Sequence, residues 1–284
     1  MKMGMAQEIE ALRKKAYQLR RDVVEMVYRA QSGHPGGALG MADLLTVLWY
    51  KFIRADPKDP HWPDRDRFIL SNGHTCPILY AILADKGYFP REELWKLRKL
   101  GALLQGHPST AHKIPGVEFS SGSLGIGLSF SCGLALAGKL DKKDYHVFCS
   151  ISDAECQEGQ TWEAALTAHH YRLDNLIAIL DRNNCQIDGP TEQIMSLEPL
   201  AEKWRAFGWE TLEIDGHDYE QIISAFEAAL RGRGRPKIII SHNLLGKGIS
   251  FMEGDYRWHH GAPTPEQFAQ ALRELDSKMG GPIR

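Results

Sequence analysis

The feature that most constrains the fold is the stretch from 146 to 186, in which two apolar runs flank a helical pattern. The apolar runs are residues 147–151 and 176–180, and residues 161–171 between them have helical spacing. Two short apolar runs on either side of a helix predict a βαβ unit, in which parallel strands are joined by a crossover helix. We therefore expect both runs to be strands of one parallel sheet.

Polar side chains follow both predicted strands. Asp153 comes after the first strand, and Asp181, Asn183 and Asn184 come after the second. In an open parallel sheet the carboxyl ends of the strands form the edge where ligands bind. Mg²⁺ usually keeps only one or two carboxylates beside substrate phosphates, so one Asp, one Asn amide and one backbone carbonyl would suit it. The alternative is that Asp153 and Asn183 are ordinary turn residues.

This stretch resembles the metal-and-diphosphate motif of thiamine diphosphate (TPP) enzymes, and its segments ECQEGQTWEAA and LDNLIAILDRNNCQIDG resemble transketolase in particular. The resemblance implies TPP with Mg²⁺ or Ca²⁺ as cofactors. It implies that Asp153, Asn183 and the backbone carbonyl of Cys185 hold the metal, and that Ala154 and Asn183 lie at the diphosphate. Ser152 and Ala154 stand where the family has glycines. If residue 154 needs a positive φ, its alanine is strained, and Ala154→Gly should tighten cofactor binding or raise stability.

Four histidine motifs elsewhere in the chain also resemble transketolase elements, and they occur in the family's order. They are SGHPGG with His34, SNGH with His74, QGHP with His107, and WHHGAP, in which His260 directly precedes the glycine and is the better match. Each histidine alone could be an ordinary loop residue or a helix cap. By the resemblance, His34, His107 and His260 face the substrate and His74 donates to the diphosphate. An imidazole group suits proton transfer at sugar hydroxyls because its pKa lies near neutrality.

A glycine-rich segment opens a helix of small and apolar residues at 122–138. A helix N-terminus with such an approach offers unpaired N–H groups to an anion, although glycines also permit close helix packing. The segment resembles the family's TTGPLGQG element, which implies that Gly122, Ser123 and Leu124 contact the cofactor. Because the helix is so apolar, we expect it to be buried on most sides and to form an interface between chains.

The remaining patterns predict further helices and strands. Strands and helices alternate from about residue 145, which favours an α/β fold with a parallel sheet and helices on both faces. By the resemblance this is the diphosphate-binding domain of the TPP fold, and we treat residues 1–284 as one domain. The other expected strands are 67–71, 210–214 and 237–241, and the other expected helices are 8–31, 38–50, 77–86, 91–100, 197–206, 218–231 and 265–279.

Composition argues against several classes of function. A net charge of −2 suggests neither a nucleic-acid surface nor an anionic membrane, and no apolar run approaches the roughly 20 residues of a membrane span. The N-terminal segment is charged and amphipathic rather than a signal peptide. The 5 cysteines show no paired spacing, which favours reduced thiols in the cytoplasm. We expect Cys156 to be a packed residue, with a redox-active thiol as the alternative.

The resemblance covers nearly the whole chain, yet transketolases of the common kind are much longer. It implies the N-terminal subunit of a split transketolase, which transfers a two-carbon glycolaldehyde unit from a ketose phosphate to an aldose phosphate. Such a chain would need a separate C-terminal subunit and would also associate with itself as a dimer. The resemblance further implies that Glu158 is a catalytic residue at the subunit junction. Two alternatives remain open. One is the α-subunit of a 2-oxo acid dehydrogenase, and the other is a non-catalytic binding or regulatory subunit with the TPP fold.

Overall fold

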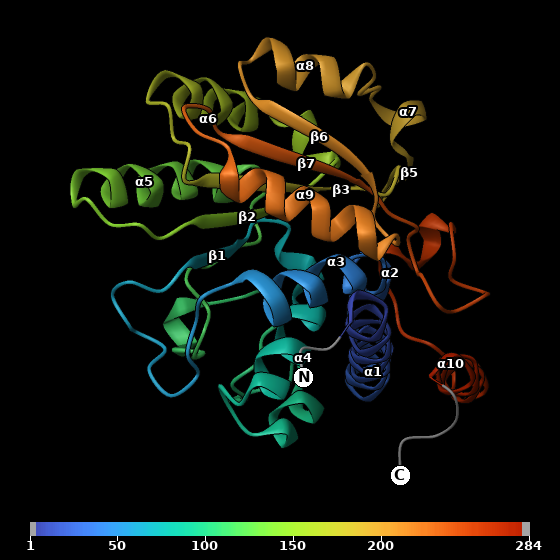
Figure 1. The fold of residues 1–284 in the computed structure, drawn as a ribbon. Helices are drawn as coiled ribbons and strands as arrows, with labels where there is room; N and C mark the ends of the chain where they lie inside the picture. Colours follow the sequence, from blue (N-terminus) through green and yellow to red (C-terminus); the bar gives the residue numbers. More distant parts are fainter. Residues whose placement is uncertain (1–3, 280–284) are drawn as a thin grey trace.

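The computed structural model describes residues 4–279 and contains one parallel sheet of five strands in the order β1-β2-β3-β7-β6 (Figure 1). All neighbouring strands of this sheet run parallel, which confirms the expected parallel sheet. A small antiparallel hairpin, β4-β5, follows β3. The strands are β1 (Arg67–Leu70), β2 (Val147–Ser152), β3 (Leu176–Arg182), β4 (Cys185–Gln186), β5 (Gly189–Pro190), β6 (Glu210–Asp215) and β7 (Lys237–His242).

Helices cover both faces of the sheet, as expected. Helices α5, α6 and α8 pack on one face, whereas α1, α3, α4 and α9 pack on the other, with α10 beside α1 (Figure 1). Short 3₁₀ turns connect many of the elements. The helices are α1 (Met5–Ala30), α2 (Pro35–Gly40), α3 (Ala42–Val47), α4 (Cys76–Lys86), α5 (Ile126–Leu140), α6 (Gly159–His170), α7 (Thr191–Ile194), α8 (Leu200–Ala206), α9 (Tyr219–Arg231) and α10 (Pro265–Lys278).

The central strands are apolar throughout because each of their faces enters a different core. Phe148 of β2 packs in the core that contains α1, α4 and α9, and its neighbours Val147 and Cys149 pack in the core under α5 and α6. The same alternation holds for Ile177 and Ala178 of β3. Successive side chains of a strand point to opposite faces, so a strand covered on both sides needs a continuous apolar run.

Several predicted helices differ from the observed ones. The helix expected at 38–50 is observed as two short helices, α2 and α3, and a π-helical turn, Leu48–Phe52, that continues α3. It begins earlier than expected because Pro35 is well suited to a first helical turn. The helix expected at 91–100 is only a 3₁₀ turn, Arg91–Lys96, after which Leu97 leaves helical geometry. Helix α8 begins at Leu200 rather than at 197, since the residue before Pro199 is disfavoured in helical geometry.

Helix α5 is apolar on two sides but is buried on only one of them. The side made of Gly127, Leu128, Cys132 and Ala135 packs against the sheet and α6. Ile126, Phe130 and Leu140 are exposed on the same helix. The expectation that this helix is buried on most sides is therefore wrong for the chain alone, and an apolar face remains that another chain could cover.

Two further expectations concern cysteines and membranes. All five cysteines are free and buried, and burial raises the pKa of the Cys156 thiol well above its usual range, so this residue is packed rather than reactive. Among the helices of residues 4–279, none combines the length and the apolarity that a membrane crossing requires.

Candidate active site

The loops at the carboxyl edge of the sheet enclose a cavity of about 390 Å³. Three of these loops follow β1, β2 and β3, and a fourth is the glycine-rich segment before α5. All but three of the site residues predicted from the sequence line the cavity, and the exceptions are Ser123, Asp153 and His260. The lining residues are His34, His74, His107, Gly122, Leu124, Ser152, Ala154, Gln157, Glu158, Asn183, Cys185, Gln186, Ile187 and His259.

Asp153 lies under this cavity and is fully buried. Its Oδ1 accepts a hydrogen bond from Ala154 N (2.8 Å), and its Oδ2 accepts one from Asn184 N (2.8 Å). The amide of Asn183 is oriented by two bonds: its Nδ2 donates to Asp181 Oδ2 (2.8 Å) and its Oδ1 accepts from Cys185 N (2.9 Å). Burial raises the pKa of Asp153 to about 6. A carboxylate, an amide oxygen and the Cys185 backbone on adjacent loops form a donor set of the kind that a hard divalent cation prefers.

A buried arginine that the sequence analysis missed contacts Asp153 directly. Arg182 is 2% exposed, and its Nη1 donates to Asp153 Oδ2 (3.2 Å) and to Thr191 Oγ1 (2.8 Å). Its Nη2 donates to Glu192 Oε1 and Glu198 Oε1, both at 2.9 Å. It therefore ties the segment after β3 to the predicted metal ligand. The available signal was a charged residue within an apolar strand, because a buried charge needs a partner.

Five histidines, which we call the histidine cluster, gather at the cavity. The ring centroid of His34 lies 4.8 Å from that of His260, 5.4 Å from His74, 5.6 Å from His259 and 6.1 Å from His107. Burial and the neighbouring His259 and His260 lower the pKa of His34 to about 3. Burial also lowers the pKa of His74, His107 and His259. These four imidazoles are therefore neutral near pH 7, so each can donate from one nitrogen and accept at the other.

One fully buried nitrogen of the cluster lacks a hydrogen-bond partner within the described residues. His34 Nδ1 is buried and finds no hydrogen-bond partner among residues 4–279. Ser121 Oγ, beside the glycine-rich segment, is also buried and also lacks a hydrogen-bond partner among these residues. Buried polar atoms are nearly always satisfied in native proteins, by protein, water or ligand. Two such atoms next to one cavity fit a site that is completed by a bound polar group.

The doubled histidine of the WHHGAP motif divides between two surfaces. His259 lines the cavity and lies 4.9 Å from His74 between ring centroids. His260 is exposed and lines a neighbouring hollow together with Arg257 and Trp258. The backbone at His260 is extended, with φ −135° and ψ 148°, and the rings of His259 and His260 lie 5.6 Å and 4.8 Å from the ring of His34. The sequence assigned the substrate to His260, and the structure adds His259, which lines the cavity, as a second candidate.

The glycine-rich segment ends later than predicted, because α5 begins at Ile126. Gly122 and Gly125 have φ values of +146° and +83°, a region that favours glycine. Two N–H groups near the helix start are already used: Gly125 N donates to Glu155 Oε1 (2.9 Å) and Gly127 N donates to Ser71 Oγ (3.1 Å). Only the remaining N–H groups of this segment could serve an anion.

Ala154 has ordinary geometry, so the strain considered from the family's glycine is absent. The residue begins a 3₁₀ turn, Ala154–Gln157, and is not among the non-glycine residues with positive φ. Glycine at such a position only adds freedom to the unfolded chain. We expect Ala154→Gly to lower the free energy of unfolding by about 0.5–1 kcal/mol in urea titrations, with no gain in TPP affinity. A variant that is more stable or binds TPP more tightly would contradict this assignment.

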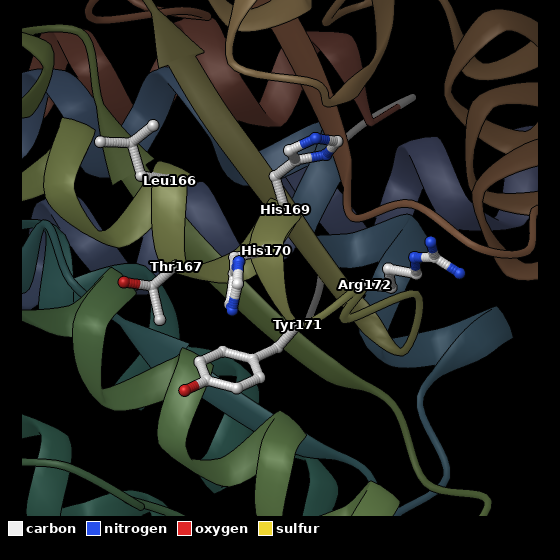
Figure 2. A pocket seen from close by; sticks show the side chains of 6 residues that line it. All are labelled: Leu166, Thr167, His169, His170, Tyr171 and Arg172. Atoms are coloured by element: carbon white, nitrogen blue, oxygen red, sulfur yellow. The ribbon is translucent and has the colours of Figure 1, made fainter.

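A second hollow, of about 640 Å³, lies at the C-terminal end of α6 (Figure 2). Helix α6 starts beside the cavity at Gly159 and runs for 12 residues, which places its far end about 18 Å away. None of the predicted site residues lines this hollow, so it is separate from the candidate site. Its lining residues are Leu166, Thr167, His169, His170, Tyr171 and Arg172.

Comparisons with known proteins identify relatives of this chain. Residues 12–280 match the family described as "Transketolase, thiamine diphosphate binding domain". The chain is 43% identical over 272 residues to an apulose-4-phosphate transketolase subunit of Phocaeicola vulgatus, and the match covers 96% of each chain. It is 42% identical over 274 residues to the 6-deoxy-6-sulfo-D-fructose transketolase subunit SqwG of Clostridium sp., covering 96% of this chain and 99% of that one.

Among solved structures, the transketolase of Campylobacter jejuni is similar, with a TM-score of 0.89 and 34% sequence identity. The match covers 98% of this chain but only 43% of that one. The chain thus spans the full length of the relatives that are named as subunits, and less than half the length of this solved transketolase.

Proposed function

The chain belongs to the family of the transketolase thiamine diphosphate binding domain, and on that premise we propose that it is the N-terminal subunit of a split transketolase. The reaction we propose is transfer of a two-carbon glycolaldehyde unit from a ketose phosphate to an aldose phosphate, with TPP and Mg²⁺. The observation that carries the proposal is the cavity itself, where four neutral histidines lie beside the donor set around Asp153 and Asn183.

The donor set and the cavity fit the proposed cofactors. Asp153, Asn183 and the backbone carbonyl of Cys185 would hold the metal, because all three supply hard oxygen atoms. Residues around the glycine-rich segment and the turns after β1 and β2 would bind the diphosphate, namely His74, Gly122, Ser123, Leu124, Ala154 and Asn183. When bound, TPP supplies the carbon nucleophile that attacks a carbonyl group of the sugar.

The histidine cluster would act on the sugar. A neutral imidazole can accept a hydroxyl proton at one nitrogen while it donates a hydrogen bond from the other. His34, His107 and His259 line the cavity in this state, so we assign them to bind sugar hydroxyls and to move protons. His260, which lies beside His34 on the exposed side, would contact the part of the substrate that remains outside.

The proposal includes partners. The relatives that this chain matches end to end are named as transketolase subunits, and we propose a separate C-terminal subunit that brings the pyrimidine-binding and third domains. Glu158 is exposed and lines the cavity, and it would lie at the junction between subunits. The exposed side of α5, with Ile126 and Phe130, would pair with a second copy of this chain. We place the complex in the cytoplasm, acting on sugar phosphates.

The test is an assay of two-carbon transfer with purified chain, TPP and Mg²⁺, with and without a candidate C-terminal subunit, over a set of ketose and aldose phosphates. We expect no turnover by the chain alone and turnover once the subunit is added. Robust turnover by the chain alone would contradict the split organisation. Tight Mg²⁺-dependent TPP binding by the complex without any turnover would favour a non-catalytic subunit instead, and turnover only with a 2-oxo acid would favour a 2-oxo acid dehydrogenase.

A further inference from the structure

Glu155 is a buried carboxylate to which the proposed mechanism gives no role. It lies two positions after Asp153, is 0% exposed, and does not line the cavity. Its Oε1 accepts hydrogen bonds from Gly125 N (2.9 Å) and from Ser71 Oγ. Its Oε2 accepts from Ser152 N (2.8 Å), with Ser152 Oγ at 3.4 Å. One side chain therefore satisfies donors from three separate segments.

These segments are three of the loops that enclose the cavity. Ser71 opens the turn that carries His74, Gly125 ends the glycine-rich segment, and Ser152 is the last residue of β2 before Asp153. We call residues 71–75, 122–127 and 152–158 the three cavity loops. Each of them holds residues assigned above to the diphosphate or the metal, so the position of Glu155 fixes the parts of the cofactor site relative to one another.

The loops also interlock by shape around Glu155. Ser71 Oγ accepts from Gly127 N (3.1 Å) while it donates to Glu155, and a Cβ atom at Gly127 would overlap the Ser71 side chain. A Cβ atom at Gly73 would likewise overlap Ser121 Oγ. Contacts this close leave the loops little freedom to shift independently, provided that the hydrogen bonds at their centre are made.

Both carboxylate oxygens of Glu155 act as hydrogen-bond acceptors, although burial raises the pKa of this carboxyl. Both oxygens accept from backbone N–H groups, and the Ser71 proton is directed to Glu155 because Ser71 Oγ already accepts from Gly127 N. Within residues 4–279 no lysine, arginine or histidine forms an ion pair with it. A buried carboxylate without a neighbouring cation is stable only when hydrogen-bond donors surround it. The stabilisation that Glu155 gives to the fold therefore depends on this particular arrangement of loops.

We propose that Glu155 is a positioning residue that preforms the diphosphate and metal site by holding the three cavity loops in fixed positions relative to one another. The proposal deepens the proposed function and rests on it. Because Glu155 acts through Gly125, Ser71 and Ser152, its loss should mainly affect cofactor affinity. The turnover rate of the fully loaded enzyme should change much less.

The test is Glu155→Gln in the complex with the C-terminal chain. The amide of glutamine keeps the shape, but its NH₂ group cannot accept from an N–H donor, so at least one loop loses its bond. We expect the Kd for TPP in the presence of Mg²⁺, measured by calorimetry, to rise at least about tenfold. At saturating TPP, kcat should return to near the wild-type value. Hydrogen exchange of the cofactor-free chain should increase at residues 71–75 and 122–127.

Asp66→Asn is the matched control. Asp66 is also a buried carboxylate, and it accepts from Arg54 N and His146 N, both at 2.8 Å. It precedes β1, so it lies at the opposite edge of the sheet from Glu155. We expect this variant to lose stability in urea titrations without weaker TPP binding or faster exchange in the cavity loops.

The outcomes separate this proposal from the proposed function. A wild-type complex that does not bind TPP would overturn both. If the wild-type complex binds TPP and the Glu155→Gln variant binds it equally well, only the role proposed for Glu155 is overturned. Equal weakening by Asp66→Asn would also overturn it, because the effect would then be general destabilisation. If Glu155→Gln fails to fold, Ser71→Ala removes one donor at milder cost, and unchanged TPP affinity in that variant would overturn the proposal.

Discussion

Replacing His259 by alanine is expected to lower kcat/KM for sugar phosphates by about 10²- to 10⁴-fold, the range for loss of a positioned acid–base group. The side chain lines the cavity beside His74 and is neutral near pH 7 because burial lowers its pKa. His107→Ala should have an effect of similar size for the same reason. TPP affinity should change little in both variants, since these groups are assigned to the substrate rather than to the diphosphate.

Two comparison variants sharpen this experiment. His260→Ala should cause a smaller loss than His259→Ala, because His260 is exposed and lines the neighbouring hollow instead of the cavity. His61→Ala should leave the kinetics unchanged, because His61 is exposed and lies before β1, at the opposite edge of the sheet. A greater loss in His260→Ala would return the substrate role to that residue. A loss of TPP binding in proportion to activity would argue against substrate roles for all of these histidines.

Asp153→Asn is expected to weaken Mg²⁺-dependent TPP binding at least about tenfold, because it removes the only carboxylate of the proposed donor set. Asn183→Ala should have a similar effect by removing the amide oxygen. Arg182 keeps its bonds to Glu192 and Glu198 in both variants, so the fold should persist. Calorimetry on the assembled complex, with circular dichroism to check folding, measures the result.

Two controls belong to the metal experiment. A chelator should abolish TPP binding to the wild-type complex if the metal bridges protein and diphosphate. Asn175→Ala removes a part-buried hydrogen bond from the side-chain amide to Ala135 O just before β3. This position is far from the carboxyl edge, so the variant should leave TPP affinity intact. Unchanged affinity in both Asp153→Asn and Asn183→Ala would exclude this metal site.

The sheet was predictable because its signals are local. The apolar runs of β2 and β3 and the polar residues at their ends lie within one short stretch of sequence, and their physical cause is burial on both faces. The candidate site was predictable for a related reason. Each histidine motif lies at or beside a break between regular elements, where its glycines and prolines interrupt longer helices, and all of these motifs contribute a histidine to the cavity.

The parts that sequence analysis missed depend on partners that are distant in the chain. Glu155 and Ser71 are separated by 84 positions, and no local pattern indicates that they touch. Arg182 binds Glu198 only because the segment after β3 folds back over Asp153. The sequence did not indicate that His259 lines the cavity, because the motif match rests on the histidine before the glycine.

The order of the strands has a consequence for the chain before it meets any partner. Strands β1 and β6 form the edges of the sheet, and β6 carries the exposed acidic residues Glu213 and Asp215. A charged edge strand resists addition of a neighbour's strand, which is a common route to domain swapping and fibrils. The solubility of the newly made chain therefore depends less on its sheet than on the apolar side of α5, and coexpression with whatever covers that helix is the natural way to produce it.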